Sequence, residues 1–174
     1  MVRGFTLIEL MVTISIALVM LMAAVPSYTA ISEYFVMTRL ARSLEGFIHQ
    51  ARSEAVFRHQ TLWVHVQTSE GSTQTDKIYG GQWQLVLSDR KESGGELLRT
   101  LSGKTYPNIV FSAHLDFLDH VFLDGVLGRL KGNGSFRFHP QNNPERELRL
   151  VMSSGAGRIR LCAEGSERYG YPEC

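Results

Sequence analysis

The chain has 174 residues, a formal net charge of +1 and an apolar fraction of 44%, which allow one domain plus an anchor and exclude two large domains. The sequence contains no Gly-x-Ser-x-Gly nucleophile elbow and no phosphate-binding loop. Its six histidines show no metal-ligand spacing with one another or with the two cysteines, and the acidic group Asp116, Asp119 and Asp124 matches no calcium loop. We therefore expect a protein that is not an enzyme and that carries no cofactor or metal.

The first informative element is an apolar segment near the N-terminus. Residues 10–25 contain only two polar side chains, and with residues 5–8 the segment reaches the ~20 residues that a membrane-spanning helix needs. Glu9 lies inside this segment, where a charged side chain costs at least ~2.5–3.5 kcal/mol and should have a partner. Arg3 and Gly4 precede the apolar residues, which reverses the order found in a secretory signal peptide. The pattern predicts a membrane anchor in which Glu9 has a function.

Residues 4–9, with the sequence Gly-Phe-Thr-Leu-Ile-Glu, resemble the type III signal of type IV pilins and type II secretion pseudopilins. The resemblance implies that a prepilin peptidase cleaves between Gly4 and Phe5, and that the new terminal amine of Phe5 is methylated. It also implies that Glu9 pairs with the terminal amine of a neighbouring subunit during assembly. An ordinary N-terminal anchor with a stray glutamate is the alternative.

One long helix is expected over residues 5–58. Its first half is apolar on all sides, as in a helix surrounded by lipid, and Pro26 should bend its axis. Beyond Pro26 a single apolar stripe predicts a second half that packs on a globular domain. The stripe consists of Leu40, Leu44, Phe47, Ile48, Ala51 and Ala55.

After residue 59 the hydrophobic period changes from that of a helix to that of a strand. The stretch 114–127 has no clean period, and Asn133-Gly134 is a hairpin signal between the strands on either side of it. Strands are expected at residues 61–67, 82–87, 96–101, 109–112, 126–131, 135–139, 147–152 and 157–162, with a further hairpin at 153–156. The expected fold class is α+β, with the long N-terminal helix packed on an antiparallel β-sheet or small β-sandwich. The expected segments are a leader at 1–4, a transmembrane and assembly helix at 5–28, an amphipathic helix at 29–58 and a β-rich domain at 59–174.

Three further segments are similar to the FimT/GspH-type branch of minor pilins. They are residues 51–55 (Ala-Arg-Ser-Glu-Ala), 81–83 (Gly-Gln-Trp) and 150–162 (Leu-Val-Met-Ser-Ser-Gly-Ala-Gly-Arg-Ile-Arg-Leu-Cys). This branch contains minor pilins of type IV pili and the minor pseudopilin of type II secretion. The resemblance implies single-pass insertion in the inner membrane, a C-terminal domain in the periplasm, and assembly with other pilins into a fibre at the cell surface.

Residues 157–160, Gly-Arg-Ile-Arg, resemble the element through which FimT-type minor pilins linked to natural transformation contact DNA. In a strand, Arg158 and Arg160 would share one face about 6.5–7 Å apart, and each guanidinium could hold a phosphate. Gly157 would leave the backbone open to close approach. Binding of this kind is directed at the phosphate backbone and is independent of sequence.

Charge supports an anionic partner for this region. Residues 126–160 carry seven Lys and Arg residues against two Glu residues, a net charge of +5. Arg146 and Arg149 are weaker candidates for the same contact. The alternatives are a solvated strand face or protection of a sheet edge, in a structural minor pilin or GspH-like pseudopilin that primes assembly without binding DNA.

The two cysteines, Cys162 and Cys174, lie near the end of the chain. Arg3 is expected on the cytoplasmic side of the membrane, which places the remaining chain where disulfides persist. A bridge would close a loop of about 13 residues and contribute roughly 3 kcal/mol in the chain-entropy model. A metal or redox pair is the alternative, but the close spacing of such sites is missing.

Overall fold

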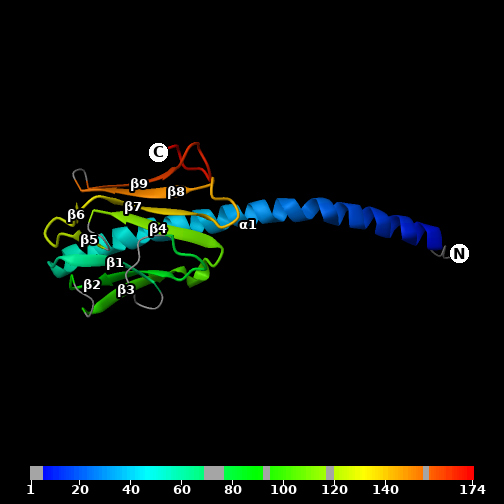
Figure 1. Ribbon diagram of the computed structural model, residues 1–174. Coiled ribbons are helices and arrows are strands. Elements are labelled where there is room, and N and C mark those ends of the chain that lie inside the picture. The colour runs from blue at the N-terminus through cyan, green and yellow to red at the C-terminus, as the bar shows by residue number, and fades with distance from the viewer. Residues whose placement is uncertain (1–5, 69–76, 92–94, 117–119, 155–156) are drawn as a thin grey trace. The chain divides into compact units, whose positions relative to one another are not determined.

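The computed structural model describes residues 6–68, 77–91, 95–116, 120–154 and 157–174, apart from the side chains of residues 23–27. The chain divides into two compact units, Met1–Phe35 and Val36–Cys174. A single helix, α1 (Leu7–Arg58), contributes to both, and all the described strands belong to the second unit (Figure 1).

The N-terminal end of α1 is capped by Thr6. Its Oγ1 atom accepts a hydrogen bond from the backbone N–H of Glu9 at 3.3 Å, which satisfies one of the donors that a helix leaves unpaired in its first turn. The hydroxyls of Thr13 and Ser15 donate to the carbonyls of Leu10 and Met11, so the two polar residues of this segment are also satisfied within the helix. The large apolar side chains of residues 7–22 are exposed.

The helix continues across Pro26. The bend expected at this residue stays a prediction, because the side chains of residues 23–27 lie outside the described part of the structure. Within the described part of the chain, we find no helical stretch that combines the length and the apolar character needed to cross a bilayer.

The second half of α1 packs through the stripe that the sequence indicates. Every member of that stripe is buried, and Met37 and Ala41 extend it by burying fully as well. The helix ends in a Schellman arrangement: His59 has a φ of 52°, its N–H donates to the carbonyl of Val56, and the N–H of Gln60 donates to the carbonyl of Ala55. In the last turn, a 2.6 Å hydrogen bond to the Glu54 carboxylate raises the pKa of Arg58.

The first sheet has five antiparallel strands in the order β3-β2-β1-β5-β6. They are β1 (Leu62–Thr68), β2 (Trp83–Ser88), β3 (Leu97–Ser102), β5 (His120–Leu123) and β6 (Leu130–Lys131). A short 3-10 helix, η1 (Gly103–Thr105), follows β3.

The second sheet has four antiparallel strands in the order β4-β7-β8-β9. They are β4 (Ile109–Leu115), β7 (Gly134–Pro140), β8 (Leu148–Ser153) and β9 (Arg158–Ala163). Figure 1 shows β9, drawn in orange-red, at the edge of this sheet beside the C-terminal tail. The expected α+β class and the antiparallel sandwich are therefore confirmed.

Both sheets and the second half of α1 share one hydrophobic core. At its centre the indole of Trp83 stacks on Phe111 with ring centroids 4.5 Å apart, and Phe111 contacts Phe136 at 5.6 Å. Gly103 lies against the same indole, because a Cβ at this position would approach its Cε2 atom to 2.5 Å. The core thus links the two sheets through aromatic rings from β2, β4 and β7.

Two expectations about the strands are wrong. The strand expected at 126–131 is reduced to β6, because an Asp124 cap and a turn occupy the residues before it. Asn133-Gly134 does not close a hairpin, since β6 belongs to the first sheet and β7 to the second. Asn133 instead accepts from the N–H and hydroxyl of Ser154 and donates to Asp116, which holds neighbouring connections together where the chain changes sheets.

Candidate functional site

The candidate site lies on the outer face of the second sheet. Along β8 the side chains alternate, with Leu148, Leu150 and Met152 buried in the core and the residues between them partly exposed. Register pairs Arg160 with Val151 and Arg158 with Ser153, so both arginines lie on the outer face. Their side chains differ in exposure, since Arg158 is exposed and Arg160 is partly covered.

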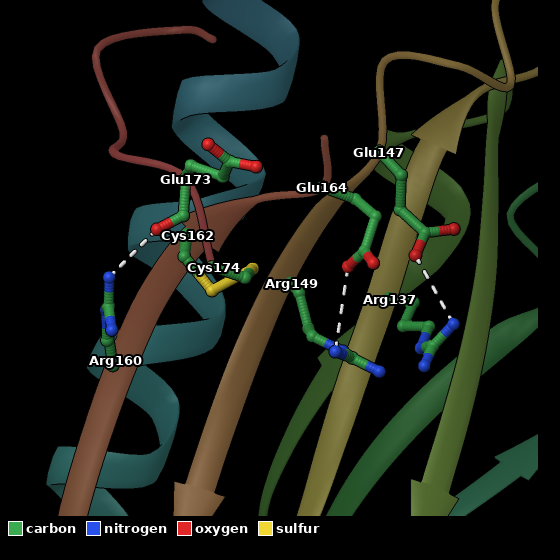
Figure 2. Close-up of a disulfide and its surroundings, with 8 residues drawn as sticks. All are labelled: Arg137, Glu147, Arg149, Arg160, Cys162, Glu164, Glu173 and Cys174. Atoms are coloured by element: carbon green, nitrogen blue, oxygen red, sulfur yellow. Dashed lines mark hydrogen bonds and ion pairs between the residues drawn. A yellow bond between two sulfur atoms is a disulfide. The ribbon is translucent and has the colours of Figure 1, made fainter. Parts of the chain in front are cut away.

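Arg160 is tied to the C-terminal tail. One guanidinium nitrogen, Nη2, donates to the backbone carbonyl of Glu173 at 2.9 Å (Figure 2). The tail also pairs with the strand edge, because Ala163 donates to the Pro172 carbonyl at 2.8 Å and accepts from the N–H of Cys174 at 3.0 Å. Arg160 therefore helps to position the tail through one of the five N–H donors that a guanidinium carries.

The expected disulfide is present. Cys162 and Cys174 are bonded with their Cα atoms 4.9 Å apart, and Figure 2 shows the bridge between β9 and the tail. Cys162 is opposite Arg149 in the β8–β9 register, so the bridge lies beside the arginines. The bond fixes the end of the chain to the candidate site.

Gly157 opens β9 with a φ of 57°, a left-handed conformation that glycine adopts at little cost. A Cβ at this position would meet no atom within 4 Å. Glycine is needed here for the backbone turn, and the space around it is open, as close approach by a ligand requires.

The weaker candidates are paired with carboxylates. Arg149 lies 3.6 Å from Glu164, and Arg146 lies 3.8 Å from Glu145. By contrast, Arg158 makes no hydrogen bond or ion pair within the part of the chain that the structure describes. Arg158 is thus the candidate whose charge is most available to a ligand.

The structure adds a residue that the sequence reasoning did not single out. Arg137 on β7 is directly opposite Arg149 on β8, and it lies 3.7 Å from Glu147. The Phe-Arg-Phe alternation at 136–138 indicates that Arg137 faces outward, but only the β7–β8 register reveals its neighbour. We call Arg137, Arg149, Arg158 and Arg160 the arginine face.

The net charge of +5 found over residues 126–160 does not form one patch. Lys131 belongs to β6 in the first sheet, and Arg129 precedes it. Glu164, from outside that segment, contacts Arg149 on the arginine face. The local positive charge is therefore smaller than the sequence suggests.

Comparison with known proteins decides which family has this architecture. The family described as Type II transport protein GspH matches residues 40–170. The chain belongs to the GspH family. Residues 1–25 of this GspH-family protein also match the family described as Prokaryotic N-terminal methylation motif.

Solved structures agree with the GspH-family fold. Two crystal structures of the type IV minor pilin FimU from Pseudomonas aeruginosa (strain PAO1) are similar to it, each with 22% identity over 74% of this chain. The structure in space group P21 is covered over 92% of its length with a TM-score of 0.53, and the one in P65 over 98% with a TM-score of 0.52. At this identity the likeness shows the fold alone. No curated protein sequence matched the chain.

The chain accordingly combines membership of the GspH family and an N-terminal methylation motif with a fold like that of the type IV minor pilin FimU. The methylation motif implies processing by a prepilin peptidase and assembly with other pilins. The processing residues Gly4 and Phe5 lie outside the described residues, and Glu9 is exposed in the first turn of α1.

The remaining polar residues of the GspH-family domain form no metal-binding group in the described ranges. No three His, Cys, Asp or Glu side chains there are placed to hold a metal ion. Of the acidic group, Asp116 accepts from Asn133, Asp124 caps a turn, and Asp119 is outside the description. Among the histidines, His65 is buried and bonded to Ser88 and the Arg90 carbonyl, which is a structural role.

Proposed function

We propose that this protein is a minor pilin of a type IV pilus, inserted in the inner membrane with its C-terminal domain in the periplasm. A prepilin peptidase cleaves it between Gly4 and Phe5, and Phe5 is then methylated. Glu9 pairs with the terminal amine of a neighbouring pilin, which removes most of the cost of holding either charge away from water. The match of residues 1–25 to the methylation motif and the pilin fold support this assignment.

We propose further that the assembled subunit binds extracellular DNA for uptake, as in natural transformation, without sequence preference. The observation that carries this proposal is the outward placement of Arg158 and Arg160 on one strand, with Arg158 exposed and unpaired within the described chain. A guanidinium holds a phosphate through charge and a fixed fork of donors. Gly157, with open space beside it, leaves room for a DNA backbone.

Titration of a labelled duplex with the full-length protein, kept in solution by detergent, tests this binding. Replacing Arg158 and Arg160 together by Gln is expected to weaken binding several-fold. It should also lower the slope of log K against log salt concentration by about 2, since roughly one unit is lost per phosphate contact. The control is the double variant Arg129→Gln with Lys131→Gln, which removes an equal charge from β6 and the connection that leads to it. The titration is carried out at two salt concentrations. If wild type and the Arg158 and Arg160 double variant bind the duplex with equal affinity at both, the assignment of these residues is refuted.

A second candidate function is supported by a separate observation. Arg149 and Arg146 face carboxylates, and Arg160 is bonded to the tail. These contacts also suit a structural subunit that primes a pilus or a type II secretion pseudopilus without touching nucleic acid. The same titration separates the two functions, because a structural subunit would show no salt-dependent binding of DNA.

A further inference from the structure

Two arginines face each other at the centre of the outer face of the second sheet. Arg137 on β7 and Arg149 on β8 are register partners. Like charges directly opposite each other across two strands are destabilising. The side chains are only 31% and 25% exposed, so water screens their repulsion incompletely. Such a pair needs negative charge close by.

The contacts within the protein do not satisfy this pair. Neither guanidinium makes a hydrogen bond to any described residue, and the Nε atoms of both are buried without a partner. Their carboxylates, Glu147 and Glu164, lie 3.7 and 3.6 Å away, beyond hydrogen-bond length. Buried polar groups in native proteins are nearly all hydrogen-bonded, so two neighbouring Nε atoms without a hydrogen-bond partner need an explanation.

The two carboxylates come from the same end of the sheet. Glu147 immediately precedes β8 and Glu164 immediately follows β9, and the N–H of Glu164 donates to the Glu147 carbonyl at 3.0 Å. Figure 2 shows both side chains reaching along the strands toward Arg149 and Arg137. Two arginines and two glutamates thus form a group with no net charge. Its ion pairs are long, so a ligand with negative charge could take the place of the glutamates.

The pair continues the line of the other two arginines. In the β8–β9 register Arg149 is opposite Cys162. Arg160 lies two residues from Cys162 along β9 and Arg158 lies two residues further, so both are on the same face as Arg149. With strands about 4.8 Å apart and alternate residues about 6.8 Å apart, the oblique line from Arg137 to Arg158 is roughly 16 Å long. A line of this length is long enough to reach more than one phosphate of a DNA strand, whose charges repeat about every 3.4 Å along the helix axis.

Taking the DNA binding proposed above as given, we propose that Arg137 and Arg149 form a second phosphate subsite, which Glu147 and Glu164 occupy when DNA is absent. A phosphate oxygen accepts hydrogen bonds from guanidinium N–H groups that the glutamates leave unpaired. Binding exchanges two long ion pairs within the protein for charge-assisted hydrogen bonds to DNA. Arg137 is then a binding residue, and the glutamates set the affinity by competing with the ligand.

The test uses the full-length protein in detergent and a labelled duplex at two salt concentrations. Arg137→Gln is expected to weaken binding several-fold and to lower the salt slope by about 1, whereas Arg137→Lys keeps the charge and the salt slope and retains only part of the affinity, because it lacks the guanidinium fork. Glu164→Gln, at an exposed position, is expected to strengthen binding several-fold. Arg129→Gln and Glu145→Gln are the matched controls for losing one positive or one negative charge. A thermal melt of each variant establishes that it is folded.

Three results would overturn the inference. Arg137→Gln could titrate like Arg129→Gln, or Glu164→Gln could strengthen binding no more than Glu145→Gln. In either case, loss of binding in the Arg158 and Arg160 double variant would leave the proposed function intact, and only the second subsite would be rejected. Absence of DNA binding by the wild-type protein would reject both proposals together.

Discussion

Two glycines of this protein are required for different physical reasons. Gly157 has a positive φ and open space where a Cβ would be, whereas Gly103 is crowded by the indole of Trp83. A left-handed backbone costs an L-residue roughly 1–2 kcal/mol, and overpacking a core costs roughly 1–3 kcal/mol with displacement of neighbours. The first cost concerns the backbone of one residue, and the second concerns the packing of the core.

We therefore expect Gly157→Ala and Gly103→Ala to differ in kind. Gly157→Ala should lower the melting temperature by a few degrees and leave the near-ultraviolet signal of Trp83 unchanged, because the added methyl group contacts nothing. Gly103→Ala should lower stability and also change that signal. Gly157→Asn is the control, since Asn tolerates positive φ better than Ala and should recover part of the loss. A larger loss for Asn than for Ala would contradict an origin in backbone conformation.

A capping hydrogen bond from the backbone of Glu9 helps to explain the role of this residue. Thr6 caps the helix through the backbone N–H of Glu9, so the carboxylate itself is not needed for that bond. An acidic residue in the first turn gains about 0.3–1 kcal/mol from the helix dipole, which is small beside the cost of leaving it unpaired in lipid. The larger energy argues that Glu9 acts between subunits.

At the scale of elements, α1 ends at a residue that suits its position poorly. His59 occupies the left-handed position of the Schellman arrangement, where glycine is usual. The side chain is exposed, so its replacement disturbs no packing. The end of this helix is therefore less stable than its hydrogen bonds allow.

His59→Gly is expected to stabilise the protein by about 0.5–1 kcal/mol, because glycine adopts positive φ without a steric penalty. The matched control is His49→Gly, an exposed position inside the same helix, where glycine should destabilise by roughly the same amount. Urea unfolding of both variants measures the difference. Destabilisation by both substitutions would mean that the strain at residue 59 is negligible.

The elements differ in how far the sequence predicts them. The stripe on α1 and the strands with clear alternation, such as β8, are expected within a residue or two of their observed bounds. β5 is missed because three of its four residues are buried, so no period of two appears. His120 is buried against His65 on the face opposite Val121 and Leu123, which a local pattern does not report.

At the scale of the whole molecule, the division into two sheets is not a local property either. Asn133-Gly134 has the composition of a hairpin turn, but the chain uses it to pass from one sheet to the other. The candidate site shows the same limit, since alternation places Arg158 and Arg160 on one face while only pairing of β7 with β8 brings Arg137 beside Arg149. The spacing of residues predicts which face of a strand each side chain occupies. The neighbours of that side chain on the adjacent strands depend on the pairing register, which the spacing does not contain.

At the scale of the whole molecule, fibre assembly tests the proposed role of the Glu9 charge. We expect Glu9→Ala and Glu9→Gln to leave the protein in the membrane fraction while lowering its amount in sheared fibres roughly ten-fold or more. The reason is that an unpaired buried amine costs about 3–5 kcal/mol. Glu9→Asp keeps the charge and should retain part of the assembly. Immunoblots of the two fractions measure this, and wild-type amounts of Glu9→Gln in fibres would rule out a role for the charge.

The bridge between Cys162 and Cys174 decides where this protein can be labelled. Because Cys174 is bonded to β9 beside Arg149 and Arg160, a purification tag or fluorophore attached directly after Cys174 would begin on the surface whose chemistry is in question. If cleavage occurs after Gly4 as proposed, a tag placed before Gly4 would be removed with the leader. Reporters for this protein belong instead at exposed positions of the first sheet, such as Leu97 at the start of β3.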